Sequence, residues 1–216
     1  MTTSRDTVMG KIRAALADDG SPIPIPRDYI RRGQHDPGSG PVIELLVDRL
    51  VDYRALVHQV TADGLPAALD EALSGMTSVV IGTGLDPAIA HACTGIGRTV
   101  TTDSAPQVLS PQELDAIDAV VTTARVAIAM SGTIVLDGGA GQGRRAITLV
   151  PDRHIVILTA DQIVETVAEA ISRLNPTAPL TMIAGPSATS DIELERVEGV
   201  HGPRTLHVII IRGSPD

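Results

Sequence analysis

The residues best suited to bind a ligand in this sequence are glycines and arginines that gather in its second half. Four glycines lie within the six residues from Gly138 to Gly143, and Arg144 and Arg145 follow them directly. Glycine allows the backbone to approach a ligand closely, and arginine binds a carboxylate or phosphate through two parallel hydrogen bonds. These residues predict a loop that binds a small anion, and the alternative interpretation is a flexible surface hairpin.

Two further segments combine hydroxyl, acidic and basic side chains. The stretch 185–193 contains three hydroxyl residues and Asp191, and we expect a helix to begin there, because the free N–H groups of a helix N-terminus bind anions. The turn 199–204 brings the imidazole of His201 close to the guanidinium of Arg204. Ordinary helix capping in the first segment and a structural histidine in the second are the alternatives.

The elements that must position these loops form a regular pattern from residue 42 onward. Short apolar runs, expected to be strands, lie near 55–60, 78–82, 99–102, 119–121, 126–129, 133–136, 154–158, 180–184 and 206–211. Helical patterns alternate with most of them. This order predicts an α/β fold with a mostly parallel sheet flanked by helices, and the closely spaced runs at 126–136 predict an antiparallel hairpin. Ligands bind beyond the carboxyl ends of parallel strands, so we expect the candidate loops to converge on one cleft there.

The first 41 residues follow a different pattern. Val8, Ile12 and Leu16 recur at helical spacing and predict an amphipathic helix over 4–17. The stretch 18–41 is rich in proline and glycine and predicts an extended arm, either exposed or docked on another subunit. We therefore divide the chain into an N-terminal helix with its arm, residues 1–41, and an α/β domain, residues 42–216.

Composition excludes several kinds of chemistry. The net charge of −9 and the absence of Trp and Phe argue against a nucleic-acid surface and against a stacked flavin. Lys11 is the only lysine, which removes Schiff-base and Walker-type chemistry. Cys93 is the only cysteine, so the chain cannot hold an iron–sulfur cluster by itself. We expect no bound cofactor and no metal, and arginines as the main anion ligands.

The sequence also predicts the cellular compartment. No run approaches 18 consecutive apolar residues, so we expect no membrane span. The N-terminus is polar and leads into the helical pattern, unlike a secretory signal. With a single cysteine, these features predict a cytoplasmic protein.

At the candidate loops the sequence resembles the LUD-domain family. The runs 131–136, 141–145, 149–155, 185–193 and 199–207 are similar, in this order, to that family's central and C-terminal motifs, and the resemblance covers about residues 42–213. Family members often carry an acidic residue where this chain has Met130. The candidate ligand-binding residues are Ser131, Gly132, Thr133, Gly141, Gly143, Arg144, Arg145, Ser187, Thr189, Ser190, Asp191, His201 and Arg204.

The resemblance implies a fold similar to the group of glucosamine-6-phosphate isomerase, ribose-5-phosphate isomerase and CoA-transferases. It also implies a non-redox subunit of an L-lactate oxidation system, beside iron–sulfur partner proteins that carry the redox centres. The alternatives are a stand-alone isomerase- or CoA-transferase-like enzyme acting on a small anionic substrate, and a regulatory or interaction protein. A CoA-transferase needs a carboxylate nucleophile, and Met130 counts against one at its position.

Overall fold

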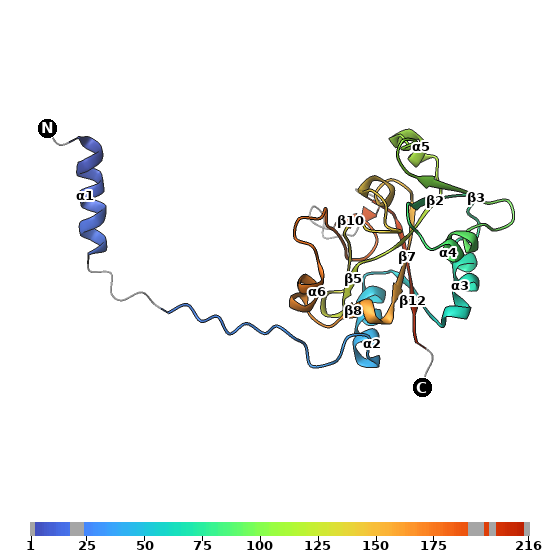
Figure 1. Ribbon diagram of the computed structural model, residues 1–216, viewed down its shortest axis with the longest axis horizontal. Coiled ribbons are helices and arrows are strands. Elements are labelled where there is room, and N and C mark those ends of the chain that lie inside the picture. The colour runs from blue at the N-terminus through green and yellow to red at the C-terminus, as the bar shows by residue number, and fades with distance from the viewer. Residues whose placement is uncertain (1–2, 18–23, 190–196, 199–201, 214–216) are drawn as a thin grey trace. The chain divides into compact units, whose positions relative to one another are not determined.

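The computed structural model describes residues 3–17, 24–189, 197–198 and 202–213. The chain divides into two compact units, Met1–Ile30 and Arg31–Asp216. In the first unit, helix α1 (Ser4–Leu16) begins with a capping box between Thr3 and Asp6 (Figure 1). Its apolar side chains Val8, Ile12 and Leu16 are exposed. The predicted helix is thus confirmed, and residues 24–39 contain no helix or strand.

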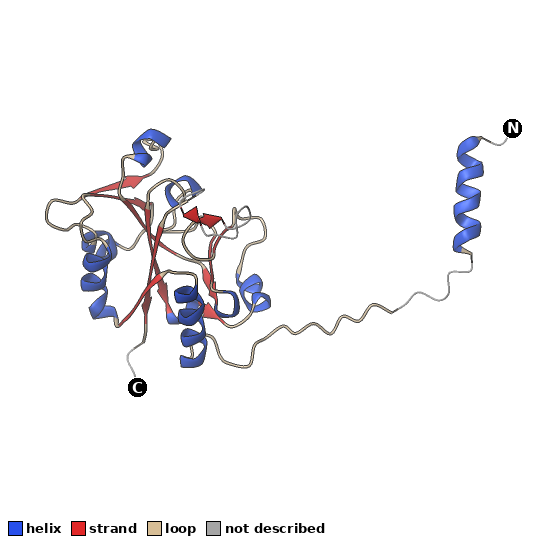
Figure 2. Cartoon of the chain, turned by 180° about the vertical axis from the view of Figure 1, so that it is seen from behind, coloured by secondary structure: helices blue, strands red, loops and turns tan. Residues whose placement is uncertain are grey.

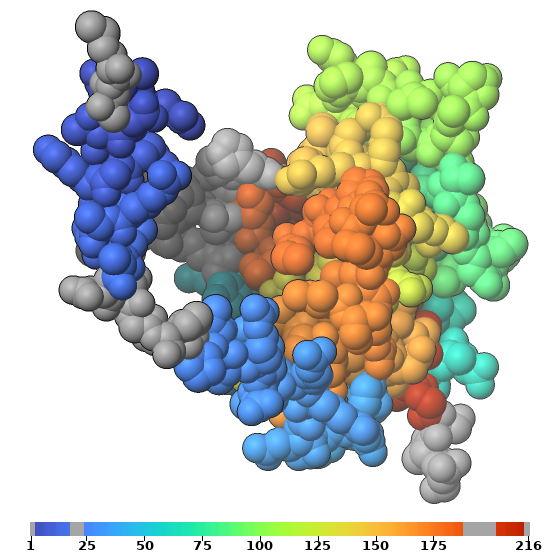
Figure 3. All heavy atoms as spheres, turned by 60° about the vertical axis from the view of Figure 1, so that its left-hand side comes forward, coloured from blue at the N-terminus to red at the C-terminus, as the bar shows by residue number. Residues whose placement is uncertain are grey.

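The last residues before α2 contact the main unit. The carboxylate of Glu165 accepts a hydrogen bond of 2.8 Å from the backbone N–H of His35, and the N–H of Gly38 donates to the carbonyl of Ile163 at 2.9 Å. Figure 3 shows this part of the chain, in lighter blue, against the orange surface of residues from about 160 onward. Residues 33–38 therefore belong structurally with the α/β unit, which begins at Arg31.

A six-stranded, entirely parallel sheet forms the centre of the main unit (Figure 2). Its strands, in their order across the sheet, are β1 (Leu56–Val60), β12 (Thr205–Ile211), β7 (Arg153–Thr159), β4 (Ala119–Thr123), β2 (Ser78–Gly82) and β3 (Thr99–Asp103). β12, the last of these in sequence, lies between β1 and β7. The α/β fold predicted from the alternating pattern is confirmed.

A second, four-stranded sheet is built from the segments that connect the central strands. Its order is β8 (Ile163–Val164), β5 (Val126–Ile128), β6 (Thr133–Leu136) and β9 (Thr181–Ile183). β5 and β6 form the expected antiparallel hairpin, joined by the 3₁₀ turn η2 (Ala129–Ser131). β9 pairs antiparallel with β6, so the expectation that this strand continues the parallel sheet was wrong.

The buried strands of the central sheet direct successive apolar side chains to opposite faces. Helices cover both faces for this reason. Val156 and Leu158 face a core formed with α2 and the smaller sheet. Ile155 and Ile157 face the opposite core, formed with α3 and α4. The helices of the main unit are α2 (Gly40–Asp52), α3 (Leu65–Ala72), α4 (Pro87–Ala92), α5 (Pro111–Asp115) and α6 (Val167–Arg173); the other 3₁₀ turns are η1 (Ala62–Gly64), η3 (Arg145–Thr148) and η4 (Ala160–Gln162).

Only part of the segment after β9 can be compared with the expectation that a helix begins within 185–193. Ala188–Thr189 form the short strand β10, which pairs antiparallel with β11 (Val197–Glu198), and residues 190–193 lie outside the described residues.

Candidate functional site

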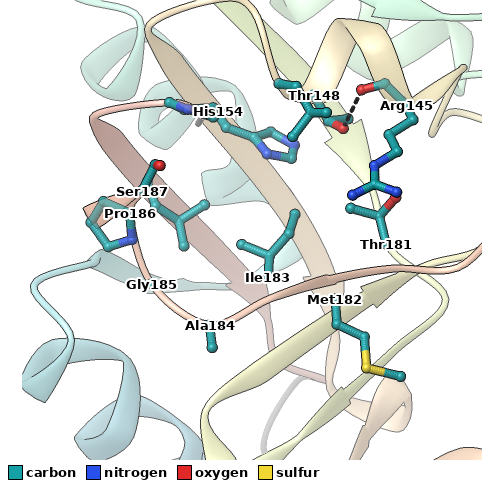
Figure 4. A pocket seen from close by; sticks show the side chains of 14 residues that line it. Arg145, Thr148, His154, Thr181, Met182, Ile183, Ala184, Gly185, Pro186 and Ser187 are labelled. Carbon is teal, nitrogen blue, oxygen red and sulfur yellow. Dashed lines mark hydrogen bonds between the residues drawn. The ribbon is translucent and has the colours of Figure 1, made fainter. Parts of the chain in front are cut away.

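A cavity of about 320 Å³ lies between the two sheets. On one side are turn η3 and the first residues of β7 and β12; on the other are β9 and the loop that follows it (Figure 4). We call it the inter-sheet cavity. Its lining residues are Arg145, Thr148, Leu149, His154, Thr181, Met182, Ile183, Ala184, Gly185, Pro186, Ser187, Gly202, Pro203 and Leu206. The cavity thus lies at the amino ends of β7 and β12, whereas we expected the cleft at carboxyl ends.

Arg145 supplies the positive charge of the inter-sheet cavity. It is the first residue of η3, and the hydroxyl of Thr148 donates to its carbonyl at 2.9 Å, which closes this turn. The side chain is exposed and extends toward Thr181 (Figure 4). Among the described residues, its guanidinium has no hydrogen-bond or ion-pair partner. This group is therefore available to an anion.

His154 lies on the wall formed by the central sheet. Its imidazole Nε2 is 2.8 Å from the hydroxyl of Thr122, and the side chain is buried. Burial lowers the pKa of His154 to about 3, so the ring is neutral at physiological pH. A neutral imidazole has one donor and one acceptor nitrogen, which suits it to a hydroxyl or carbonyl group better than to a charge.

The opposite wall joins two loops that are distant in sequence. The backbone N–H of Ser187 donates to the carbonyl of Pro203 at 2.9 Å. A Cβ on Gly202 would lie 3.3 Å from the Cβ of Ser187, so the two loops touch closely. Gly185 has a φ of +81° and lies against Tyr53 of the α2 C-terminus. The structure thus brings together Arg145, Ser187 and the turn before Arg204, which are part of the set that we expected to converge.

Arg144 and Arg204, in contrast, are engaged in ion pairs. Arg144 donates from Nε and Nη2 to the two carboxylate oxygens of Asp103, at 2.6 and 3.1 Å, and also to the carbonyl of Leu109. Arg204 pairs with Asp152. Arg144 lines a neighbouring cavity of about 470 Å³, which shares Arg145, Thr148 and Thr181 with the first. The guanidinium of Arg144 thus links Asp103 and Leu109 to the loop that precedes η3.

The glycines of the 138–143 loop also serve packing within the chain. Gly141 and Gly143 have φ values of +74° and +68°, and a Cβ added to Gly143 would lie 2.4 Å from the side chain of Ile147. The backbone N–H of Gly141 donates to the carbonyl of Thr83. Gln142 is buried and its side-chain oxygen accepts from the N–H groups of residues 137 and 138. The loop is thus bound to the ends of β2 and β4.

The hairpin candidates lie away from the inter-sheet cavity. Ser131 donates its hydroxyl hydrogen to the hydroxyl of Thr133 at 2.9 Å. Gly132, with a φ of +62°, lies against Arg49 of α2. None of these three hairpin residues lines either cavity. Ser190, Asp191 and His201 fall outside the described residues, and for Thr189 only the strand pairing is described.

The sequence reasoning did not place Thr148, His154 and Thr181 in the site. One signal could have found His154: strand alternation puts it on the same face as Val156 and Leu158, which makes it a buried polar residue among apolar ones. Nothing local marks the two threonines, since the pairing of β6 with β9 brings Thr181 into place.

The arrangement combines one cation, one neutral imidazole and several hydroxyls. No Asp or Glu is among the residues that line the inter-sheet cavity within the described chain. Such a set suits the binding of a small anion by hydrogen bonds. It offers no carboxylate nucleophile of the kind that a CoA-transferase needs. The same described residues contain no cluster of three or more potential metal ligands.

Comparison with known proteins gives consistent results. A family model described as the LUD domain matches residues 72–211. "Lactate utilization protein C" of Deinococcus radiodurans is 41% identical over 215 residues, covering 98% of this chain and 93% of that protein. The protein of the same name in Shouchella clausii is 26% identical over 191 residues, covering 82% and 81% of the two chains.

A solved structure supports the fold independently. The crystal structure of a DUF162 family protein from Deinococcus radiodurans has a TM-score of 0.67 and 38% sequence identity to this chain. The match covers 80% of this chain and 97% of that one. In addition, no helix within the described residues has the length and apolar character that a membrane span requires.

Proposed function

Because the chain belongs to the LUD-domain family, we propose that it acts in lactate utilisation and binds a small carboxylate in the inter-sheet cavity. The observation that carries the binding proposal is the guanidinium of Arg145, which has no partner among the described residues. The role in lactate utilisation is supported by the relatives named lactate utilization protein C, one of which aligns over nearly the full chain.

The chemistry of the cavity suits a 2-hydroxy or 2-oxo acid. Arg145 would bind the carboxylate through two parallel hydrogen bonds. The neutral imidazole of His154 can accept from a hydroxyl or donate to a carbonyl, depending on its tautomer. Its partner Thr122 has a hydroxyl that can reverse its own role accordingly. The volume of about 320 Å³ falls within the range of small-molecule sites.

We place the redox chemistry on partner proteins. Cys93 is the only cysteine and is buried, and burial raises its pKa to about 11. A thiol must lose its proton to ligate iron, so this side chain is a poor cluster ligand. The chain would then act as a non-redox subunit or accessory protein beside iron–sulfur subunits that oxidise lactate to pyruvate in the cytoplasm.

Calorimetric titration with L-lactate and with pyruvate tests the binding proposal. We expect saturable binding of at least one of them. In Arg145→Gln the affinity should fall by about 10- to 100-fold, because the charge-assisted hydrogen bonds of the guanidinium to the carboxylate are lost. Arg145→Lys should retain part of the affinity. Arg32→Gln is the control, because Arg32 forms an exposed pair with Asp36. Unchanged affinity in Arg145→Gln would refute the assignment.

A reconstituted system tests the role in lactate utilisation. Iron–sulfur proteins of a lactate-oxidising system would be purified with and without this chain, and the conversion of lactate to pyruvate would be measured with an electron acceptor. We expect the chain to co-purify with them and to raise the rate. Full activity without this chain, together with no association, would contradict the proposal.

A further inference from the structure

A third cavity, separate from the two described above, lies at the opposite end of the central sheet. β1, β12 and β7 end in register, because Val60 pairs with Ile211 and Ile211 pairs with Thr159. Just beyond these strand ends is a cavity of about 690 Å³, which we call the strand-end cavity. Its lining residues are Gly38, Gly40, Ile43, Gln59, Val60, Thr61, Ala160, Arg212 and Gly213. Ligands of parallel sheets bind at this edge.

Arg212 gives the strand-end cavity its charge. The residue directly follows β12, and its backbone N–H donates to the carbonyl of Val60 at 2.8 Å, which fixes its position. Strand alternation carries its side chain to the face of Val208 and Ile210, the face that α2 covers. The side chain is half-buried, and its guanidinium has no hydrogen-bond or ion-pair partner within the described part of the chain.

The described residues that line the strand-end cavity carry no negative charge to compensate Arg212. None of the nine lining residues is acidic, and the first turn of α2 carries no acidic residue. Gln59 and Thr61 add an amide and a hydroxyl. Beside the cavity, between two lining glycines, the hydroxyl oxygen of Ser39 is buried without a hydrogen-bond partner among the described residues. A half-buried cation and an unsatisfied hydroxyl are both costly, and a bound anion would offset the cost of the unpaired cation.

We infer that the strand-end cavity is a second anion site, which takes a small molecule through its carboxylate or phosphate group. Arg212 binds the anionic oxygens, and Gln59 and Thr61 contribute hydrogen bonds. Leu206, in β12, and Arg212, just after it, are six positions apart along an extended segment, which separates this site from the inter-sheet cavity by roughly 20 Å. The two sites are therefore distinct, and this inference does not depend on what the inter-sheet cavity binds.

NMR titration of the full chain, with inorganic phosphate and with citrate as separate probes, tests this inference. Backbone amide signals of residues 59–61, 160 and 212–213 should shift saturably with at least one probe. Phosphate alone would indicate a phosphoryl ligand and citrate alone a polycarboxylate. In Arg212→Gln the apparent Kd should rise about tenfold or more, whereas Arg212→Lys should retain part of the affinity.

Arg145→Gln is the matched control, because it removes the charge of the other cavity. It should leave the shifts at residues 59–61 and 212–213 unchanged, and thermal unfolding should show that all three variants fold. Saturable shifts that persist in Arg212→Gln, or no saturable shift with either probe at millimolar concentration, would overturn the inference. Loss of the shifts in Arg145→Gln would also overturn it, since the sites would then be one.

Discussion

Replacement of Arg144 by alanine should destabilise the protein, because Arg144 is the partner of a buried carboxylate. The side chain of Asp103 is only 2% exposed and that of Arg144 is 37% exposed. Burial alone would raise the pKa of Asp103, but the hydrogen bonds from Arg144 and Leu109 outweigh it and lower the pKa. Removing one partner of a buried pair costs about 3–5 kcal/mol. Because water reaches the partly exposed Arg144 side chain, we expect Arg144→Ala to lower the free energy of unfolding by about 2–3 kcal/mol.

Urea denaturation followed by circular dichroism measures this loss. Arg204→Ala is the control, because the Arg204–Asp152 pair is 62% and 54% exposed and should contribute below about 1 kcal/mol. Asp103→Asn in the Arg144→Ala background should recover part of the loss, since no charge then remains buried. An Arg144→Ala loss no larger than that of Arg204→Ala would refute the reasoning.

The same pair has a pH signature. Because the pKa of Asp103 is lowered in the folded protein, the stabilisation is present above the ordinary carboxyl pKa of about 3.9 and is lost as the pH falls through the lowered value. In Arg144→Ala the unpaired carboxyl takes up a proton more readily. The difference in unfolding free energy between the two proteins should therefore be smaller near about pH 4 than near about pH 7. An equal difference at both would contradict this account.

Three other predictions follow from the buried groups. Burial lowers the pKa of His154 to about 3 and that of His207 to about 4, so the unfolded chain binds up to two more protons than the folded protein in acid. The free energy of unfolding should therefore fall by up to about 3 kcal/mol per pH unit from about pH 6 to pH 4. A free energy of unfolding that calorimetry finds to be independent of pH over this range would exclude this account. Gly143→Ala should lower the free energy of unfolding by at least about 2 kcal/mol and Gly97→Ala by about 1 kcal/mol. Both glycines have a positive φ, but only at Gly143 would the added Cβ clash with a neighbour. Equal losses for the two variants in urea titrations would contradict this prediction. Cys93 should react with a thiol reagent only after unfolding, and rapid native-state labelling would show otherwise.

The local signals in the sequence predicted most of the fold. Ser110 and Glu113 form a capping box at the start of α5, and Asp86 caps α4 by accepting from the N–H of Ala88. The apolar runs became strands because their residues could be buried on both faces of a parallel sheet. Which sheet a strand joins is not a local property, and the assignment of 180–184 to the parallel sheet failed for that reason.

The candidate site was predictable only in part. Residue types marked Arg145 and Ser187 as ligand-binding candidates, and both line the inter-sheet cavity, but they could not show that Arg144 pairs with Asp103, 41 positions away. The glycines of the 138–143 loop have the same signature whether they approach a ligand or, as here, the ends of neighbouring strands. The site at the amino ends of β7 and β12 was missed because the rule for carboxyl ends was applied to every loop.

The position of β12 has a consequence for biosynthesis. β12, the last strand of the described chain, fills the gap between β1, about 150 positions earlier, and β7, about 50 positions earlier. Until Thr205–Ile211 leave the ribosome, β1 has no neighbour and β7 presents an open, apolar edge of the kind that promotes aggregation. Both cavities need this strand or the residues beside it, so neither can form before Thr205–Ile211 are synthesised. A nascent chain of this protein therefore depends on protection of that edge until these residues have paired with it.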